Sequence, residues 1–403
     1  MMEGLSFDKE FGKRSCVSLE QENVFFFWKG RVALFAILKA MGVGEGDKVV
    51  VPGYTCIVVP NSVVYLGAKP IYVDIDPKTF NLDPVALEEM LERERRDLRP
   101  PKALIVQHTY GIPADMDMIC AIAKKYGLSI IEDCCHAIGS KYKGKEVGTF
   151  GDAAFFSSQW SKPITTGLGG WAVVNNTELK EKMREVYDKM HEPKSRETLL
   201  LRLQYYLFSV TFTPRLFWLL MGTYRALSAA GFMVGSADRC ELASQKPPEF
   251  EKRMSRWQKM LLERKTKEIG KVIEHRKWVV SVFERHLPEI GIETVERQPD
   301  IDPVFLRYPI LTKDKRWVLE RARAEKIEIG DWFASPVHPN LDGWERVGYQ
   351  KGICPTSEEI SSRVVNLPTH PKITEKEIYR ILRFLYGMTK TGKIEKADSP
   401  TTV

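Results

Sequence analysis

Short apolar runs alternate with helix-like patterns along the first half of the chain, from about residue 25 to residue 190. In the helix-like stretches, apolar residues recur every three or four positions, as they do in helices that pack on a core. The intervening short apolar runs are typical of buried strands. The expected strands are 48–52, 70–74, 103–107, 128–131, 153–156 and 170–174, and the expected helices are 31–41, 61–66, 84–94 and 116–126.

This alternation of strands and helices predicts the fold class. It indicates an α/β protein, a three-layer sandwich whose central sheet is mostly parallel and doubly wound. Ligands of such sheets bind beyond the carboxyl ends of the strands. Residues 139–150 are polar and rich in glycine, and they predict a loop or a hairpin.

The second half of the chain follows a different pattern. It becomes helical after about residue 180, with a long charged helix expected over 248–286. Residues 292–386 mix short strands with a last helix over 375–385, which predicts a smaller C-terminal α+β domain. The expected parts are an N-terminal arm (1–24), a large domain (25–247) with an apolar helical insert near 196–247, a linking helix with the small domain (248–387), and a flexible tail (388–403).

Two apolar stretches raise the question of a membrane span. Residues 49–68 carry no charged side chain, but two prolines, a glycine and an asparagine interrupt them. Residues 199–235 are rich in aromatic residues, and arginines and a proline cut them into pieces shorter than the ~20 residues that a bilayer requires. Neither stretch is expected to span a membrane. The second favours helices packed in a core or a subunit interface, with peripheral contact with a membrane surface as the alternative.

The composition is that of a folded enzyme: 403 residues, of which 43% are hydrophobic and 28% charged, enough for two or three domains. The net charge of +7 forms no basic stripe with interleaved aromatic residues, so nucleic acid is not an expected partner. Seven cysteines include no CxxC pair, and neither a metal site nor a disulfide framework is expected. The first residues lack the apolar core of a signal peptide, which makes the reducing cytoplasm the expected location.

Three residues of the first half together point to a cofactor. Asp133 closes a buried strand, Lys162 follows in a polar turn, and Gly30 opens a helix. Each alone is ordinary, because aspartates often end strands and a lysine before a proline usually lies in a solvated loop. Pyridoxal phosphate (PLP) needs an amine for a Schiff base, a carboxylate that keeps its ring nitrogen protonated, and donors for its phosphate. A helix N-terminus supplies such donors, so the joint placement favours this cofactor.

The sequence resembles the DegT/DnrJ/EryC1/StrS sugar aminotransferases, a family of the fold-type I PLP class. The resemblance runs in order from KGRVALFAILKAMGVGEGDKVVVPGYTC to SSRVVNLPTHPKITEKEI, and it is most specific in SIIEDCCHAIGS and FFSSQWSKPITTGLGG. It implies that Lys162 forms the Schiff base and moves a proton between substrate and cofactor carbons. It also implies that Asp133 binds the pyridinium nitrogen, that His136 contacts the side of the ring with the phenolic oxygen, and that Ser157 binds phosphate.

Two parts of the site depart from the family pattern. Gly30, Arg31 and Val32 occupy the phosphate-binding turn, where the family usually has Gly-Thr. A guanidinium is a strong phosphate partner, and an arginine that faces solvent is the alternative. Cys56 stands where the family often has an aromatic residue stacked on the ring. Either its thiol or the ring of Tyr54 is therefore expected to cover the cofactor.

Other positions are left out of the expected site. Glu251 replaces an asparagine that reaches the partner subunit's phosphate, and a carboxylate would repel that phosphate. Gln159 stands where the family commonly has histidine. Trp332, His338 and His370 are not included, because packed or exposed roles are at least as common for such residues.

The lysine indicates the branch of the family. Related dehydratases carry histidine at the position of Lys162, so the resemblance implies transamination. An amino acid such as glutamate gives up its amine, and a keto-sugar, usually nucleotide-linked, receives it for envelope polysaccharides or antibiotic sugars. The resemblance also implies a homodimer with shared sites. A PLP-binding regulator or scaffold without turnover is the alternative, although a scaffold has no need for Asp133 and Lys162 together. A nicotinamide dehydrogenase is a weaker alternative, because no GxGxxG follows the first strand.

Overall fold

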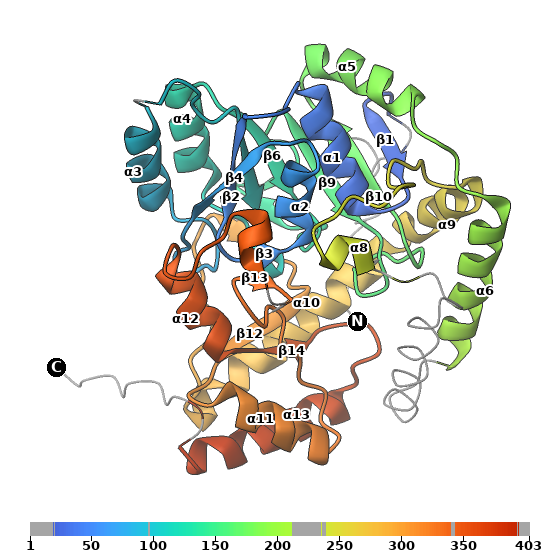
Figure 1. Ribbon diagram of the computed structural model, residues 1–403. Helices are drawn as coiled ribbons and strands as arrows, with labels where there is room; N and C mark the ends of the chain where they lie inside the picture. Colours follow the sequence, from blue (N-terminus) through green and yellow to red (C-terminus); the bar gives the residue numbers. More distant parts are fainter. Residues whose placement is uncertain are drawn as a thin grey trace.

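The computed structural model describes residues 19, 21–95, 97–211, 235, 239–339, 343–392 and 394 (Figure 1). The first half of the chain builds a large sheet with helices on both faces. The last third builds a smaller body, which lies at the bottom of the view in Figure 1. Most of the expected N-terminal arm, and residues 212–234 and 236–238 of the expected apolar insert, lie outside the described residues.

The central sheet has seven strands in the order β1-β10-β9-β6-β5-β2-β4. The strands from β9 to β4 are parallel, whereas β10 runs antiparallel to both of its neighbours. The register sets Asp133 beside Gln107 on one side and Phe155 on the other, so the carboxyl ends of three strands meet at one edge. The strands are β1 Val24–Phe27, β2 Lys48–Pro52, β4 Lys69–Val73, β5 Ala103–Gln107, β6 Ser129–Asp133, β9 Ala153–Ser157 and β10 Gly170–Val174.

Side chains of the sheet alternate between two helix-covered cores. Val49 and Val51 of β2 face one core, and Val50 faces the other. This arrangement confirms the three-layer α/β sandwich with a mostly parallel sheet. The first core is covered by α1 Gly30–Ala40, α2 Val58–Val64 and α5 Thr177–Asp188, and the second by α3 Pro84–Glu94 and α4 Met116–Tyr126.

Local sequence explains where these helices begin and end. The expected cap of α3 is confirmed, because the side chain of Asp83 accepts a hydrogen bond from the backbone N–H of Val85 at 2.9 Å. Gly127 ends α4 in the left-handed conformation, with φ of 67°. Helix α2 begins earlier than expected, at Val58, and Pro60 falls in its first turn, where a missing N–H costs little.

The smaller body has its own core around an antiparallel strand pair, β12 with β14. A parallel bridge pairs β13 with β3, the short strand that follows β2, so the small body reaches the edge of the large one. The division into domains remains a prediction. The elements are β3 Thr55–Cys56, α10 Ile269–His286, β12 Arg307–Leu311, α11 Lys315–Ala324, β13 Val337–His338, α12 Pro355–Arg363 and β14 Val364–Pro368.

The expected single helix over 248–286 is wrong, because two helices occupy this stretch. Helix α9 (Arg256–Thr266) begins at Ser255, whose side chain forms a capping box with Gln258. The residues before it are extended, and Arg253 pairs with Phe27 of β1. Because the preceding residues are extended and Ser255 caps the helix, α9 begins later than the charge pattern suggests.

The end of the chain also differs from the expectation. Helix α13 (Glu375–Lys390) continues past residue 385, because Met388 extends its buried face. A flexible tail from residue 388 is therefore wrong for the described residues up to 394. Ile394 is buried and forms an antiparallel bridge with Thr312. Residues 395–403 lie outside the described residues.

Two surface segments complete the fold. The expected loop or hairpin over 139–150 is a hairpin, β7 (Lys141–Tyr142) with β8 (Lys145–Glu146). Helix α6 (Ser195–Thr211) forms the described start of the apolar insert. No helix among the described residues is long and apolar enough to cross a bilayer.

Candidate active site

The carboxyl edge of the sheet brings four of the expected residues together. Asp133 is the last residue of β6, and Ser157 is the last residue of β9. Gly30 opens α1 so close to β9 that a β-carbon placed on it would stand 3.0 Å from Cβ of Ser157. Lys162 follows in the turn between β9 and β10, where its backbone N–H donates to the carbonyl of Gln159 at 2.9 Å. This is the edge at which ligands bind in sheets of this kind.

Asp133 and Lys162 lie in each other's electrostatic field. Burial raises the pKa of Asp133, and the N–H of Cys135, 3.0 Å from Oδ1, and the charge of Lys162 oppose that rise. Burial lowers the pKa of Lys162, and Cys135 and the carboxylate of Asp133 oppose that fall. The carboxylate and the amine therefore lie close enough at the edge of the sheet for the charge of each to act on the other.

The indole of Trp332 packs beside the amine of Lys162. Nζ of Lys162 lies 5.4 Å from the ring centroid, and Cζ of Arg307 lies 5.1 Å from the same ring. His338 stacks on Trp332 with the centroids 5.1 Å apart, and burial lowers the pKa of His338 to about 4, so its ring is neutral at pH 7. Trp332, which was left out of the expected site, is thus a neighbour of Lys162, and His338, also left out, packs against Trp332. Arg307 joins them, although no motif in the sequence points to it.

His136 is placed by aromatic stacking. Its ring stacks on Phe333 with the centroids 5.8 Å apart, and its Nδ1 makes no hydrogen bond with a described residue. Burial, followed by the charges of Lys162 and Arg307, lowers the pKa of His136 well below its ordinary value. A neutral imidazole with an unused nitrogen can hydrogen-bond an oxygen of a bound ring.

Of the two candidates for covering the ring, Cys56 and Tyr54, one is packed out of reach. Tyr54 is 0% exposed, and its hydroxyl lies 2.6 Å from that of Tyr110. Cys56 is partly exposed and pairs with His338 across the bridge between β3 and β13. Burial raises the pKa of the Cys56 thiol, which keeps it in the neutral form. The geometry thus leaves Cys56, and not Tyr54, at the surface of the site.

The start of α1 can hold a phosphate. Its N-cap residue, Lys29, makes no side-chain capping bond, so the first N–H groups of the helix are not satisfied in that way. Arg31 is buried, which excludes the solvent-facing alternative, and its Nη1 lies 2.9 Å from Oε1 of Glu241. Lys29 also pairs with Glu241, at 3.0 Å. Val32 is buried in the core below. Two cations and an uncapped helix end beside Ser157 fit a dianionic group.

Two residues that the sequence set aside already have polar partners. Glu251 forms ion pairs with Lys39 at 2.8 Å and with Lys246 at 2.5 Å. Nε2 of His370 lies at hydrogen-bond distance, 2.9 Å, from the carboxylate of Glu328.

A buried network supports the strand that ends in Asp133. The carboxylate of Glu132 accepts backbone N–H groups of Gly148, Phe150 and Gly151 at 2.7–2.8 Å. His108 accepts from a backbone N–H at Nδ1, so its Nε2–H donates to Glu132 at 3.1 Å. With Cys134 these groups lie within 4.8 Å of one another, as metal ligands would. Because the carboxylate oxygens and both imidazole nitrogens are already engaged, the cluster serves as a hydrogen-bond network.

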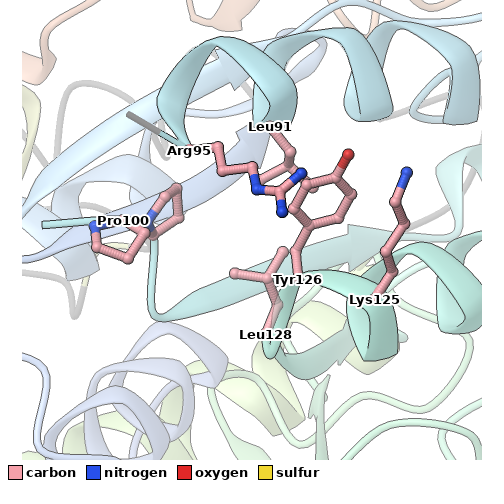
Figure 2. Close-up of a pocket in the computed structure, with 7 residues that line it drawn as sticks. Leu91, Arg95, Pro100, Lys125, Tyr126 and Leu128 are labelled. Carbon is pink, nitrogen blue, oxygen red and sulfur yellow. The ribbon is translucent and has the colours of Figure 1, made fainter. Parts of the chain in front are cut away.

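A separate hollow of about 250 Å³ lies between α3 and α4 (Figure 2). Its charges are balanced locally, because Lys125 lies 2.7 Å from Glu88 and Arg95 lies 3.8 Å from Glu92. No residue of the candidate active site contributes to it. Its walls are Leu91, Arg95, Pro100, Pro101, Lys125, Tyr126 and Leu128.

A parallel sheet with an amine and a carboxylate at its carboxyl edge, beside an uncapped helix N-terminus, is the arrangement of a fold-type I PLP enzyme. The chain belongs to the DegT/DnrJ/EryC1/StrS aminotransferase family, whose model matches residues 5–385. This is a family of PLP-dependent aminotransferases. A sugar aminotransferase of Streptococcus pneumoniae with this fold has been solved both with PLP and with pyridoxamine phosphate (PMP). The family, the fold class and the cofactor expected from the sequence are thus confirmed.

Individual relatives match over different lengths. A GDP-perosamine synthase of Caulobacter vibrioides is 43% identical over 167 residues, which are 41% of this chain and 43% of that protein. A pleiotropic regulatory protein of Geobacillus stearothermophilus is 28% identical over 86% of this chain and 80% of its own length. A DegT DnrJ EryC1 StrS aminotransferase of Brucella abortus superposes with a TM-score of 0.70 at 24% identity, covering 91% of this chain and 85% of that one. The more identical relative is thus matched over less than half of its length.

Proposed function

We propose that the chain transfers an amino group from an amino acid, such as glutamate, to a nucleotide-linked keto-sugar. The observation that carries this proposal is the proximity of Lys162 and Asp133 at the carboxyl edge of the sheet, where the charge of each acts on the pKa of the other. The name of the C. vibrioides relative, GDP-perosamine synthase, supports a nucleotide-linked amino sugar as the product. A homodimer and a cytoplasmic location, which the family resemblance implies, are part of the same proposal.

Each residue of the site has a defined part in this proposal. When bound, PLP supplies an electron sink for negative charge at the substrate carbon. Lys162 holds the amine that attaches the cofactor and then moves the proton, and the lowered pKa leaves more of this amine unprotonated near neutral pH. Asp133 provides the negative charge for the ring nitrogen. His136 offers its free Nδ1 to the oxygen side of the ring.

The phosphate is assigned to the start of α1. Gly30, Arg31 and Val32 supply the helix end, and Ser157 supplies a hydroxyl from β9. The absence of a β-carbon on Gly30 lets a ligand approach the backbone beside Ser157. Cys56 is assigned to the exposed face of the ring. Together these contacts would fix the plane of the cofactor between the sheet edge and the small body.

A regulator without turnover is the second candidate. The G. stearothermophilus relative, named a pleiotropic regulatory protein, aligns over most of this chain, and this observation favours keeping the alternative. A chain that only binds PLP needs a phosphate site but no proton-transferring amine. The lowered pKa of Lys162 beside Asp133 favours the unprotonated amine, and shifted pKa values of this kind are more frequent at catalytic sites than elsewhere.

The visible spectrum of the purified, cofactor-loaded protein separates the two candidates. For an aminotransferase, adding L-glutamate is expected to change the colour, and a keto acid is expected to restore it. Lys162→Ala is expected to slow this response by at least ~10³-fold, because both the covalent group and the proton carrier are lost. Lys145→Ala, which removes an exposed lysine of β8, is the control. A wild-type colour that responds to no amino donor would favour the regulator, and an unimpaired Lys162→Ala enzyme would refute the role of the lysine.

A further inference from the structure

Arg307 is a cation of the site that lacks an ionic partner among the described residues. Its guanidinium forms no ion pair or hydrogen bond with them, and Glu328 and Asp331 act on it only at longer range. A β-carbon on Gly330 would come within 2.8 Å of Nη1 of Arg307, so the glycine makes room for the guanidinium. Arg307 is partly exposed, which lets a ligand reach it. The fold thus accommodates this cation by shape without neutralising it.

Two further hydrogen-bond donors next to Arg307 are unused. Nε1 of Trp332 and Nδ2 of Asn366 are buried and form no hydrogen bond with a described residue. The amide of Asn366 is oriented by its other end, because Oδ1 accepts the backbone N–H of Trp332 at 2.7 Å. Nδ2 carries two hydrogens, so the nearby hydroxyl of Tyr110 leaves at least one of them available.

These groups point to a single kind of ligand. The guanidinium, the indole N–H and the amide NH₂ all donate, and none of them accepts. A cluster of donors that includes a guanidinium cation favours an oxyanion, and a planar guanidinium pairs best with a planar carboxylate through two parallel hydrogen bonds. We propose that Arg307, Trp332 and Asn366 form the subsite that binds the α-carboxylate of the amino donor. This inference rests on the proposed function and names its donor-binding residues.

The position of Lys162 explains why an α-carboxylate fits better than a diphosphate. Lys162 and Arg307 lie 5.4 Å and 5.1 Å from the centroid of the Trp332 ring, and, after burial, the charge of Arg307 contributes to lowering the pKa of Lys162. In an α-amino acid the carboxylate is attached to the carbon that carries the exchanging amine. In a nucleotide sugar, the sugar ring separates the keto carbon from the diphosphate. Only the amino donor places an anion this close to the reacting carbon.

The small body holds this subsite in a fixed position. Arg276 of α10 donates from Nη1 to the carbonyls of Phe305 and Leu306, at 3.2 Å and 2.9 Å, just before Arg307. The same nitrogen donates to Oγ1 of Thr369, just after β14, at 2.6 Å. The strands that carry Arg307 and Asn366 are therefore clamped at adjacent ends. Such preorganisation reduces the cost of ordering the site on binding.

Two measurements on the cofactor-loaded protein test this inference. The first is calorimetric binding of glutarate, a dicarboxylate that has no amine and cannot react. The second is the single-turnover rate with L-glutamate compared with benzylamine, an amine that lacks a carboxylate. Arg307→Met is expected to weaken glutarate binding and the response to glutamate by about 10- to 100-fold, the range for hydrogen bonds to a charged group. The rate with benzylamine is expected to stay within about threefold, and Arg307→Lys is expected to restore part of the binding.

Arg297→Met is the matched control, because Arg297 also lies over an aromatic ring, 5.5 Å from Phe305, but pairs with Glu284 away from the site. Glutarate binding that is unchanged in Arg307→Met would overturn the inference, and so would equal losses with glutamate and benzylamine. Loss of GDP or UDP binding with glutarate binding intact would also overturn it, by assigning Arg307 to the nucleotide. If the wild type binds glutarate through Arg307 but reacts with no donor, the proposed function fails and the carboxylate subsite stands.

Discussion

Gly30 and Ser157 lie in such close contact that a single methyl group on Gly30 would stand 3.0 Å from Cβ of Ser157. The same methyl would also lie 3.0 Å from the carbonyl oxygen of Phe156. The first turn of α1 and the end of β9 therefore form one surface, with no side chain between the helix end and the serine hydroxyl. This closeness is the physical reason for a glycine at the start of the phosphate-binding turn.

Replacement of this glycine is expected to weaken cofactor binding. Gly30→Ala should lower PLP affinity by at least about tenfold, because one tight contact with the backbone displaces the helix end that donates to the phosphate. Equilibrium dialysis against PLP measures this effect. Gly270→Ala is the control, since a β-carbon there meets nothing within 4 Å, and it should leave the affinity unchanged. Wild-type affinity in Gly30→Ala would contradict the assignment of this turn.

The pKa of Asp133 predicts a pH-dependent stability difference. Its folded-state pKa is raised by burial above the ordinary value of 3.8. Below that value the group is protonated in both states and costs nothing, whereas above the folded pKa it is a buried charge that destabilises the cofactor-free protein. Asp133→Asn should therefore be more stable than the wild type at pH 7, with the difference vanishing below about pH 4.

Denaturant unfolding of the cofactor-free proteins at several pH values measures this difference. Asp117→Asn, at an exposed position on α4, is the control and should show no comparable gain at pH 7. The Asp133→Asn variant should also lose most of its donor response, because a neutral amide cannot hold a proton on the ring nitrogen. A variant that is active and no more stable than the wild type would contradict the assigned role.

Glu241 is expected to stabilise the protein most when no phosphate is bound. It pairs with both Lys29 and Arg31 in a buried position. Glu241→Gln removes the carboxylate that pairs with the buried Arg31 and the partly exposed Lys29, which should cost about 3 kcal/mol in the cofactor-free protein. PLP brings its own negative charge to this place and should recover part of the loss. Thermal unfolding with and without PLP tests this, and an equal loss in both states would argue against a shared position for carboxylate and phosphate.

The exposed face of α6 is expected to contact a second copy of the chain. Leu199, Leu203, Tyr206 and Leu207 are 47–60% exposed at helical spacing, while Tyr205 on the other face packs near Trp160. Replacing Leu203 and Leu207 by glutamate should lower the dimer fraction in sedimentation experiments. Flotation with liposomes tests the alternative membrane contact. Lost flotation with an unchanged dimer would contradict the expected interface.

The sequence could predict both the large sheet and the part of the site at its carboxyl edge, because both follow from the local alternation of strands and helices. Strands and helices that alternate along the chain place Asp133 and Ser157 at adjacent strand ends, and Lys162 follows in the next turn. These positions follow from short-range order, because each strand end is reached within one crossover. The resemblance to a family supplied the roles, which the local pattern alone did not.

The side of the site that the small body provides could not be predicted in this way. Arg307, Trp332 and Asn366 come from three segments that meet only because β12 pairs with β14 and Gly330 pairs with Asn366. Such long-range pairing leaves no periodic signal in any one segment. Glu241 was missed for a similar reason, since it is distant in sequence from Arg31. The continuation of α13 to Lys390 depends on packing against the core of the small body, which the local sequence pattern does not predict.

Identification of the lysine that binds PLP covalently tests the role of Lys162 without relying on any substrate. The loaded protein is reduced with borohydride, digested, and analysed by mass spectrometry. We expect a pyridoxyl group on the peptide that contains Lys162, lost in Lys162→Ala and retained in Lys145→Ala. A pyridoxyl group on any other lysine, with Lys162 unmodified, would contradict this role.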